Sequence, residues 1–435
     1  MTPAARIKAC IDLLEKIAVS RIPMDGTIGD YMRVRRYIGS KDRSAIAERT
    51  YEIVRHTARL GWWLKKTGAE DTPRNRVLAW LAMGECCAPK RLKDLFDGSK
   101  YGPDKLSDEE RAYVEKWEGD VLNHSAMPES VRAECPLLYE DKLRSYFGPD
   151  FVPEMEAMLH PAPLDLRVNI WRATRDKARA YLSADGVETD ETIFSPWGLR
   201  ARGKAYLSKT KAFAKGWIEI QDEGSQLIAL ACDVQPGMQV LDYCAGAGGK
   251  TLALAASMGN KGRIVAMDLE PRRLEKSRAR LKKAGLADCV EIRPLSDEKN
   301  RKWLRRQKES FDLVLTDVPC SGTGTWRRNP DMRWRTYGPP LEELVDIQAD
   351  ILEKVAKTVK PGGRLVYATC SLLPDENERQ IESFLAGHPE FSLFPLPDSL
   401  RAVCAGEKNE PVPFMRLTPY RHGTDGFFAA VLTRT

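Results

Sequence analysis

The 435-residue sequence predicts a multidomain protein in which a helical bundle over 1–135 and a small α+β module over 136–220 precede an α/β domain over 221–435. Three observations carry this prediction. The first part shows apolar residues at helical spacing, the second mixes short strand-like and helix-like runs, and the third alternates the two kinds of run to its end. Such alternation is typical of a mostly parallel sheet with helices on both faces.

In the first part, helices are expected at Ala5–Val19 and at Ser44–Leu64, where apolar residues recur at intervals of three and four. Ser40 precedes the second run as a capping residue. The region from about 95 to 140 is charged and contains several prolines and glycines, so it reads as loop or linker. A domain boundary is therefore expected near 130–140.

The formal net charge of +6 is modest, but basic residues gather in two places. The two clusters are Arg33, Arg35, Arg36, Lys41 and Arg43, and Arg301, Lys302, Arg305, Arg306 and Lys308. Clustered basic residues favour nucleic-acid binding, although solvated helix faces explain either cluster equally well. Residues 35–43 with 51–55 also resemble the NusB-like helical domain, a family of RNA-binding antitermination modules; a generic helical bundle is the alternative.

The composition is that of an ordinary globular protein, with 43% hydrophobic and 30% charged residues. No run approaches the roughly 18 apolar residues of a membrane span, and the N-terminus lacks the apolar core of a signal peptide. We therefore expect a cytoplasmic protein without a membrane partner, and a monomer. The ten cysteines form no Cys-x-x-Cys pair, so neither a metal site nor a disulfide framework is predicted.

The second part is expected to fold as a small module ahead of the α/β domain. Its predicted elements are a helix ending near His160, a strand at Leu164–Val168, a helix at Arg175–Ala184, and short strands at Ile193–Phe194 and Leu199–Ala201. Strands and helices of this length suit an α+β arrangement.

The third part gives the clearest pattern. Strands are predicted at 238–243, 263–268, 289–293, 311–317, 364–370 and 427–432, and helices at 250–258, 271–284, 297–307, 341–359 and 375–386. Ligands of such open sheets bind beyond the carboxyl ends of the strands. Candidate functional residues are therefore sought at those ends.

A glycine-rich turn follows the first of these strands, within Met238–Lys250. Gly246, Gly248 and Gly249 form the turn, and a helix from Thr251 points its N-terminus at it. A strand, a glycine loop and a helix in this order make a nucleotide-binding corner.

Two common glycine loops nearly fit this corner and fail. A P-loop needs glycine at the position of Cys244, and a dinucleotide fingerprint needs its third glycine where Thr251 stands. ATP and NAD are thereby disfavoured, and S-adenosylmethionine is the remaining common ligand of such a corner. Asp268, at the end of the next strand, is expected to contact its ribose, by analogy with dinucleotide sites.

Two cysteines are predicted to lie over the edge of the sheet. Cys320 sits in a Pro-Cys-Ser-Gly-Thr-Gly turn after the strand 311–317, and Cys370 follows the strand 364–369. If these strands are neighbours, both thiols face one substrate. A buried apolar role, which suits the other cysteines, fits these two poorly because polar strand ends are usually functional. Lys250 could help to activate a thiolate there.

Three motifs in this order resemble the S-adenosylmethionine-dependent RNA cytosine-5 methyltransferases of the NSUN/RsmB class. They are Cys244–Thr251, Asp317–Gly324 and Ala368–Ser371. With the NusB-like N-terminal part, the layout is similar to the RsmB-like branch, whose substrate is 16S ribosomal RNA. One departure is visible, because the usual Ala-Pro of the glycine loop is Gly246-Ala247 here.

The resemblance implies a Rossmann-like fold and a role for each motif. Cys370 would be the nucleophile that adds to cytosine C6, which makes C5 able to attack the methyl group, and Cys320 would assist release through a base role. The residues alone do not order the two cysteines, since DNA cytosine methyltransferases use a Pro-Cys cysteine as nucleophile. Asp317 would lie between the cytosine edge and the cofactor.

The implied cofactor-binding residues are Cys244, Ala245, Gly246, Ala247, Gly248, Gly249, Lys250, Asp268 and Asp317, with Arg273 and Asp297 as weaker candidates. For Asp297, a helix-capping role fits equally well.

An RNA target must be unpaired or flipped, because C5 and C6 of a stacked base cannot admit a thiol. Aromatic and basic residues alternate just after the Cys320 turn and suit base stacking and phosphate contacts: Trp326, Arg327, Arg328, Arg333, Trp334 and Arg335. A tryptophan packed on the sheet edge beside a solvated loop is the alternative. Ribosomal RNA is the expected substrate. A tRNA enzyme, a non-catalytic ribosome-assembly factor and a small-molecule methyltransferase are the other interpretations.

Overall fold

The computed structural model describes residues 1–400, 403 and 413–435 and divides into two compact units. The helical unit is Met1–Pro161 with Thr325–Gly338, and the sheet unit is Ala162–Gly324 with Pro339–Thr435. The boundary between the two units thus lies near residue 161 rather than near 135. The α+β module and the α/β domain belong to the same unit. The functional division at 135 and 220 stays a prediction.

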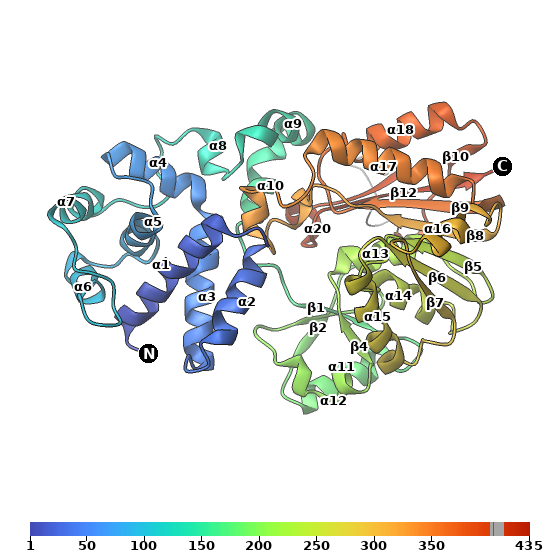
Figure 1. Ribbon diagram of the computed structural model, residues 1–435, viewed down its shortest axis with the longest axis horizontal. Coiled ribbons are helices and arrows are strands. Elements are labelled where there is room, and N and C mark those ends of the chain that lie inside the picture. Colours follow the sequence, from blue (N-terminus) through green and yellow to red (C-terminus); the bar gives the residue numbers. More distant parts are fainter. Residues whose placement is uncertain (401–402, 404–412) are drawn as a thin grey trace. The chain divides into compact units, whose positions relative to one another are not determined.

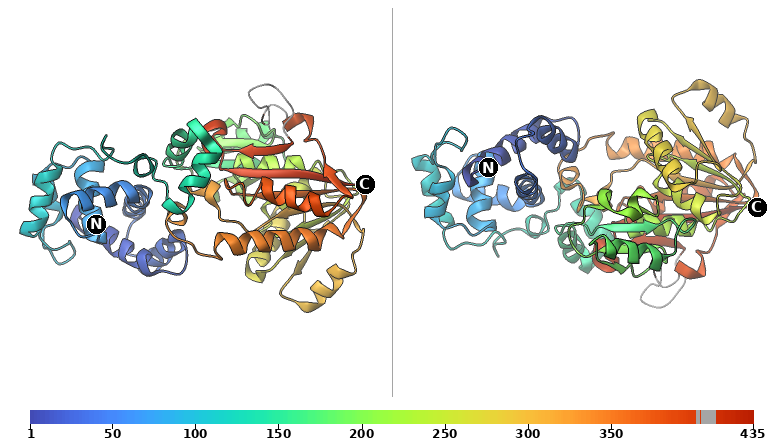
Figure 2. Two further views of the ribbon diagram at one scale, coloured as in Figure 1. Left: turned by 90° about the horizontal axis from the view of Figure 1, so that it is seen from above. Right: turned by 90° about the horizontal axis from the view of Figure 1, so that it is seen from below.

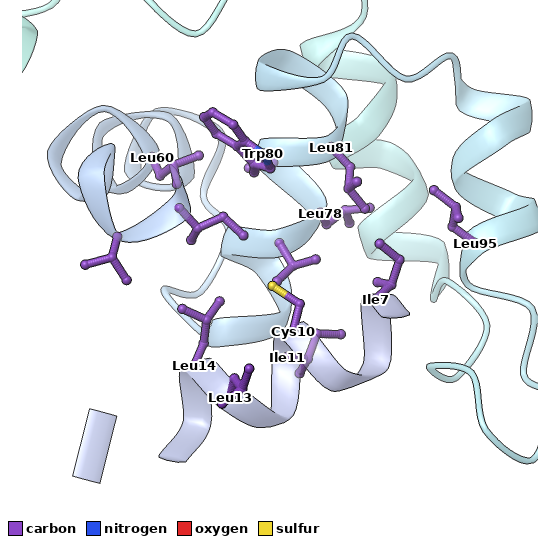
Figure 3. Packing of buried hydrophobic residues seen from close by; sticks show 14 of the residues in the cluster. Ile7, Cys10, Ile11, Leu13, Leu14, Leu60, Leu78, Trp80, Leu81 and Leu95 are labelled. Atoms are coloured by element: carbon purple, nitrogen blue, oxygen red, sulfur yellow. The ribbon is translucent and has the colours of Figure 1, made fainter. Parts of the chain in front are cut away.

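The helical unit confirms the predicted helical N-terminal region (Figure 1). Its helices are α1 (Pro3–Val19), α2 (Met24–Val34), α3 (Ser40–Arg55), α4 (Thr57–Thr67), α5 (Pro73–Ala79) running into the π-turn η1 (Trp80–Gly84), α6 (Pro89–Leu95), α7 (Asp108–Trp117), α8 (Glu129–Arg132), α9 (Leu137–Phe147), the 3₁₀ turn η2 (Gly148–Asp150) and α10 (Phe151–Ala157). Figure 3 shows the apolar face of α1, with Ile7, Cys10 and Leu14 packed toward Leu78 and Leu81.

Two predictions for this unit were wrong. The expected helix Ser44–Leu64 is broken at His56, whose backbone (φ −104°, ψ 32°) leaves the helical region between α3 and α4. The expected linker 95–140 contains α7, which begins with a capping box between Ser107 and Glu110 and buries Trp117 in the core. The many charged residues on the exposed face of α7 made its apolar spacing hard to recognise in the sequence.

The α+β module is a four-stranded antiparallel sheet in the order β2 (Thr189–Glu191), β3 (Gly198–Ala201), β1 (Asp165–Val168), β4 (Ile218–Ile220). One face packs on α11 (Arg175–Ala184) and α12 (Lys211–Ala214). The strand expected at Ile193–Phe194 is absent, because the backbone N–H groups of Phe194 and Ser195 donate instead to the Glu223 carboxylate.

The α/β domain is built on an eight-stranded sheet of Rossmann-like type, as predicted. Its order is β10 (Phe391–Leu393), β12 (Phe427–Arg434), β9 (Val359–Thr369), β8 (Phe311–Asp317), β5 (Gln239–Tyr243), β6 (Arg263–Asp268) and β7 (Val290–Pro294), with β11 (Phe414–Leu417) paired to β12. β5 to β9 are parallel, whereas β12 is antiparallel to β9. The order reverses between β5 and β8, which is where a doubly wound sheet holds its ligand.

Helices cover both faces of this sheet (Figure 1). One apolar layer unites α13 (Glu223–Ala231), α14 (Gly249–Ser257) and α15 (Pro271–Ala284) with one face, and the other unites α16 (Glu298–Arg305), α17 (Leu341–Ala356) and α18 (Glu378–Gly387) with the opposite face. In Figure 2, α17 and α18 run side by side. No helix in the described residues is long and apolar enough to cross a membrane.

Candidate active site

The two predicted thiols meet at the carboxyl ends of neighbouring strands. β8 and β9 pair in parallel with Asp317 opposite Ala368, so the chain leaves both strands at the same edge. The Sγ atoms of Cys320 and Cys370 lie 3.4 Å apart. The structure thus brings the two predicted cysteines together at one edge of the sheet, and their catalytic roles stay a prediction.

The turn that carries Cys320 is held tightly against β9 and β12. The Val318 N–H donates to Ala368 O (3.0 Å), and the Gly324 N–H donates to Cys370 O (2.9 Å). Gly324 lies directly against Gly426, where a Cβ on Gly324 would stand 2.2 Å from the Gly426 carbonyl oxygen. Only glycine fits there, which explains the last glycine of the turn motif.

The Cys320 sulfur lies in an environment that opposes its ionisation. Its hydrogen bond with Cys370 and its burial raise the pKa of Cys320 well above the ordinary value of a thiol, and the charge of Glu376 adds to this. Buried thiols beside anions stay protonated.

A half-buried ion pair joins the start of α14 to the end of β8. Lys250 Nζ donates to Asp317 Oδ2 at 2.6 Å, and Lys250 is only 9% exposed. Burial favours the neutral amine, but the charge and hydrogen bond of Asp317 outweigh it and raise the pKa of Lys250. Lys250 is therefore a fixed cation, and its ammonium also interacts with Cys370.

The glycine loop turns sharply between β5 and α14. Cys244, Gly246 and Gly248 have φ of 93°, 56° and 77°, in the left-handed region. The Gly246 N–H donates to Asp268 Oδ2 (2.7 Å), so the predicted ribose carboxylate also supports the loop. Burial raises the pKa of the Cys244 thiol well above its ordinary value, so this thiol stays protonated and unreactive.

A buried side-chain hydrogen bond joins the first turn of α14 to β5. Thr251 Oγ1 donates to Asp242 Oδ2 at 2.6 Å in a fully buried position. Burial raises the pKa of Asp242 to about 7.

The residues at this corner fit S-adenosylmethionine by their chemistry. Asp268 accepts one backbone N–H on each oxygen, from Gly246 and from Glu270, and a carboxylate has further lone pairs for two ribose hydroxyls. The N-terminus of α14 adds its partial positive charge at the strand end. Acceptors for a sugar and donors for a carboxylate are thus both present.

The two weaker cofactor-binding candidates, Arg273 and Asp297, have different surroundings. The Arg273 guanidinium lies over the glycine loop, with Nη2 2.8 Å from the position of a Cβ on Gly246. Asp297 caps α16, accepting from the Lys299 N–H at 2.8 Å, which is the alternative role considered for it.

Two charged residues of the α+β module, Arg167 and Glu219, support the glycine loop and were missed in the sequence. Arg167 is 2% exposed and donates to the Gly249 carbonyl (2.6 Å) and to Gln221 Oε1. Glu219 binds Arg280 (3.0 Å), which donates to the Ala247 carbonyl (2.6 Å). Burial lowers the pKa of Arg167 to about 10. Charged residues alternating with Leu166 and Ile218 along β1 and β4 were the available signal.

The aromatic and basic segment after the Cys320 turn does not form the predicted stacking platform. Trp326 and Arg333 are buried inside the helical unit, where Arg333 donates to the carbonyls of Ala133 and Met155. Trp334 Nε1 donates to Val54 O (3.1 Å). These side chains pack within the protein, contrary to the expectation of nucleic-acid contacts.

Comparison with known proteins decides the family of the α/β domain. Residues 229–433 match the family described as 16S rRNA methyltransferase RsmB/F. These residues form an RsmB/F-family domain. The predicted Rossmann-like methyltransferase domain is confirmed with it.

Relatives of the RsmB/F-family domain carry matching names. A probable ribosomal RNA small subunit methyltransferase B from Synechocystis sp. is 36% identical over 62% of this chain, and the match spans only 60% of that relative. A ribosomal RNA small subunit methyltransferase B from Yersinia enterocolitica is 29% identical over 92% of both chains.

Solved structures agree with the fold. A methyltransferase homolog from Pyrococcus horikoshii has a TM-score of 0.58 at 29% identity and covers 71% of this chain and 98% of its own. The NSun6 protein of the same organism, solved with SFG, has a TM-score of 0.57 at 18% identity, covers 69% and 98%, and shows the fold alone.

Proposed function

We propose that this protein transfers a methyl group from S-adenosylmethionine to C5 of a cytosine in RNA, with 16S ribosomal RNA as substrate. The observation that carries the proposal is the pair of thiols 3.4 Å apart at the ends of β8 and β9, beside the Lys250–Asp317 ion pair. One thiol suffices for most covalent catalysis; two in contact suit a reaction that must both form and release an adduct.

Cytosine C5 becomes nucleophilic only after addition at C6. The thiolate of Cys370 forms the Sγ–C6 bond, and the electron pair displaced from the C5=C6 bond makes C5 enamine-like. Asp317, between the glycine loop and the thiols, accepts a hydrogen bond from the base edge. When bound at the glycine loop, S-adenosylmethionine supplies an electrophilic methyl group on a sulfonium.

Release completes the cycle. Water takes the proton from C5, the C5=C6 bond re-forms, and the C6–Sγ bond breaks with its electron pair returning to Cys370. Cys320 adjoins the departing sulfur and assists its release by donating an S–H hydrogen bond to it. The glycine loop, Asp268 and Lys250 hold the cofactor, with Arg273 covering the loop from outside.

RNA contacts are proposed at exposed basic residues. Arg33, Arg36 and Lys41 surround the connection between α2 and α3, and Arg301, Lys302, Arg305 and Arg306 lie exposed on or next to α16. The names of the relatives support ribosomal RNA as the target.

Bisulfite sequencing of total RNA from cells with and without the gene tests chemistry and substrate together. Loss of one 16S rRNA cytosine mark is expected. Loss of a tRNA mark would keep the chemistry and replace the substrate, and an unchanged RNA profile would refute the activity and favour a non-catalytic assembly factor.

A further inference from the structure

Beneath the two thiols lies a buried carboxylate to which the mechanism above gives no role. Glu376 stands in the turn between β9 and α18 and is fully buried. In the described part of the chain, no arginine, lysine or histidine lies within ion-pairing distance of it. A buried charge without a counter-ion is costly and is common at functional sites.

Glu376 is connected to both neighbours of Cys320, directly to Ser321 and through Gln348 to Pro319. Glu376 Oε1 accepts from the Ser321 N–H (2.8 Å), and Oε2 accepts from the Ser321 hydroxyl (2.5 Å). The Gln348 side-chain amide donates both to Glu376 Oε1 (3.0 Å) and to the Pro319 carbonyl (3.0 Å). The backbone on each side of Cys320 is thus attached to one carboxylate.

The two thiols therefore interact with groups of opposite charge. Glu376 lies behind Cys320, and its charge is among the causes that raise the pKa of that thiol. Lys250, paired with Asp317, interacts with Cys370. An anion disfavours a nearby thiolate, and a cation stabilises one. The buried phenol of Tyr367 also interacts with Cys320.

We propose that Glu376 is a positioning residue that gives the two thiols different roles: it fixes the Cys320 turn and keeps Cys320 protonated, so that Cys370 is the attacking sulfur. The Cys320 S–H then donates a hydrogen bond to the Cys370 sulfur. This inference rests on the proposed function and gives a physical reason for the order of the two cysteines used there.

The test reads the thiols directly in the full-length protein. Initial rates of alkylation by iodoacetamide are followed for Cys320 and Cys370 from pH 6 to 10 by peptide mass spectrometry. In the unaltered protein Cys370 is expected to react at lower pH than Cys320. Equal rates, or Cys320 reacting first, would overturn the proposal without any variant.

Glu376→Gln keeps the shape and removes the charge. We expect this substitution to speed the alkylation of Cys320 by about tenfold at a fixed pH below the pKa of the Cys320 thiol. A tenfold rise in the rate corresponds to a fall of one unit in that pKa. Glu378→Gln is the matched control, because Glu378 lies two residues away and pairs with Arg416 (2.5 Å) instead. An unchanged Cys320 rate in Glu376→Gln refutes the charge effect.

A purely structural role is separated by Ser321→Ala, which loses the 2.5 Å hydrogen bond but keeps the charge. The proposal expects a smaller change in the pH profile than in Glu376→Gln, and a larger one contradicts it. Because alkylation needs no RNA, its outcome is independent of the bisulfite result: altered thiol profiles without any RNA mark would remove the proposed function alone.

Discussion

Arg167 offers the sharpest test of how the α+β module serves the cofactor site. Its guanidinium is 2% exposed and donates to the Gly249 carbonyl at 2.6 Å and to Gln221. Arg167→Met fills most of the space but removes one donor from each of two oxygens, at about 1–3 kcal/mol for a buried oxygen that is left unsatisfied. We expect the glycine loop to relax to satisfy them and to bind S-adenosylmethionine about tenfold to hundredfold more weakly.

Isothermal titration with S-adenosylmethionine measures the loss, and steady-state kinetics should show a raised KM for the cofactor with kcat retained at saturation. Arg172→Met is the matched control, because Arg172 also donates from the module to a backbone carbonyl, that of Ala284, away from the loop (3.1 Å). A folded Arg167→Met variant with unchanged cofactor affinity would refute the reasoning.

Three further outcomes are expected. Cys370→Ala should abolish methyl transfer from labelled S-adenosylmethionine while cofactor binding persists, and full activity would sink its assignment as nucleophile. Cys320→Ala should leave the protein trapped on RNA as a denaturation-resistant complex on a gel; an active variant that releases its RNA would contradict the role in release. His56, whose pKa burial lowers to about 4, should bind protons only on unfolding as the pH falls from about 6.5 to 4, so stability should drop in that window by up to about 3 kcal/mol. In His56→Gln, the free energy of unfolding measured by urea melts should depend less on pH over this range. The same pH dependence in the variant and in the unaltered protein would contradict this role of His56.

Local patterns predicted the α/β domain well because its elements are defined by neighbours in the chain. Strand ends and the turns after them placed Cys320 and Cys370 at one edge, and the adjacency of β8 and β9 brought them together. The charge environment that distinguishes the two thiols could not be predicted, since Glu376 follows Cys320 by more than fifty residues and acts through space.

The failures have the same physical origin. Arg167 contacts Gly249 across 82 positions, so no periodicity reports it. Trp326 and Trp334 read as a nucleic-acid platform because aromatic and basic residues look alike whether they meet bases or protein carbonyls. The break at His56 is invisible in a continuous amphipathic pattern, because the apolar spacing resumes directly in α4.

The insertion Thr325–Gly338 has a consequence for attempts to cut the protein into pieces. The chain passes from one unit to the other at Pro161, returns after Gly324 and leaves again after Gly338, so the helical unit is discontinuous. A fragment starting at Ala162 would carry this stretch without its host and present Trp326 and Trp334 to solvent. Such a fragment is expected to aggregate unless a short polar connector replaces 325–338.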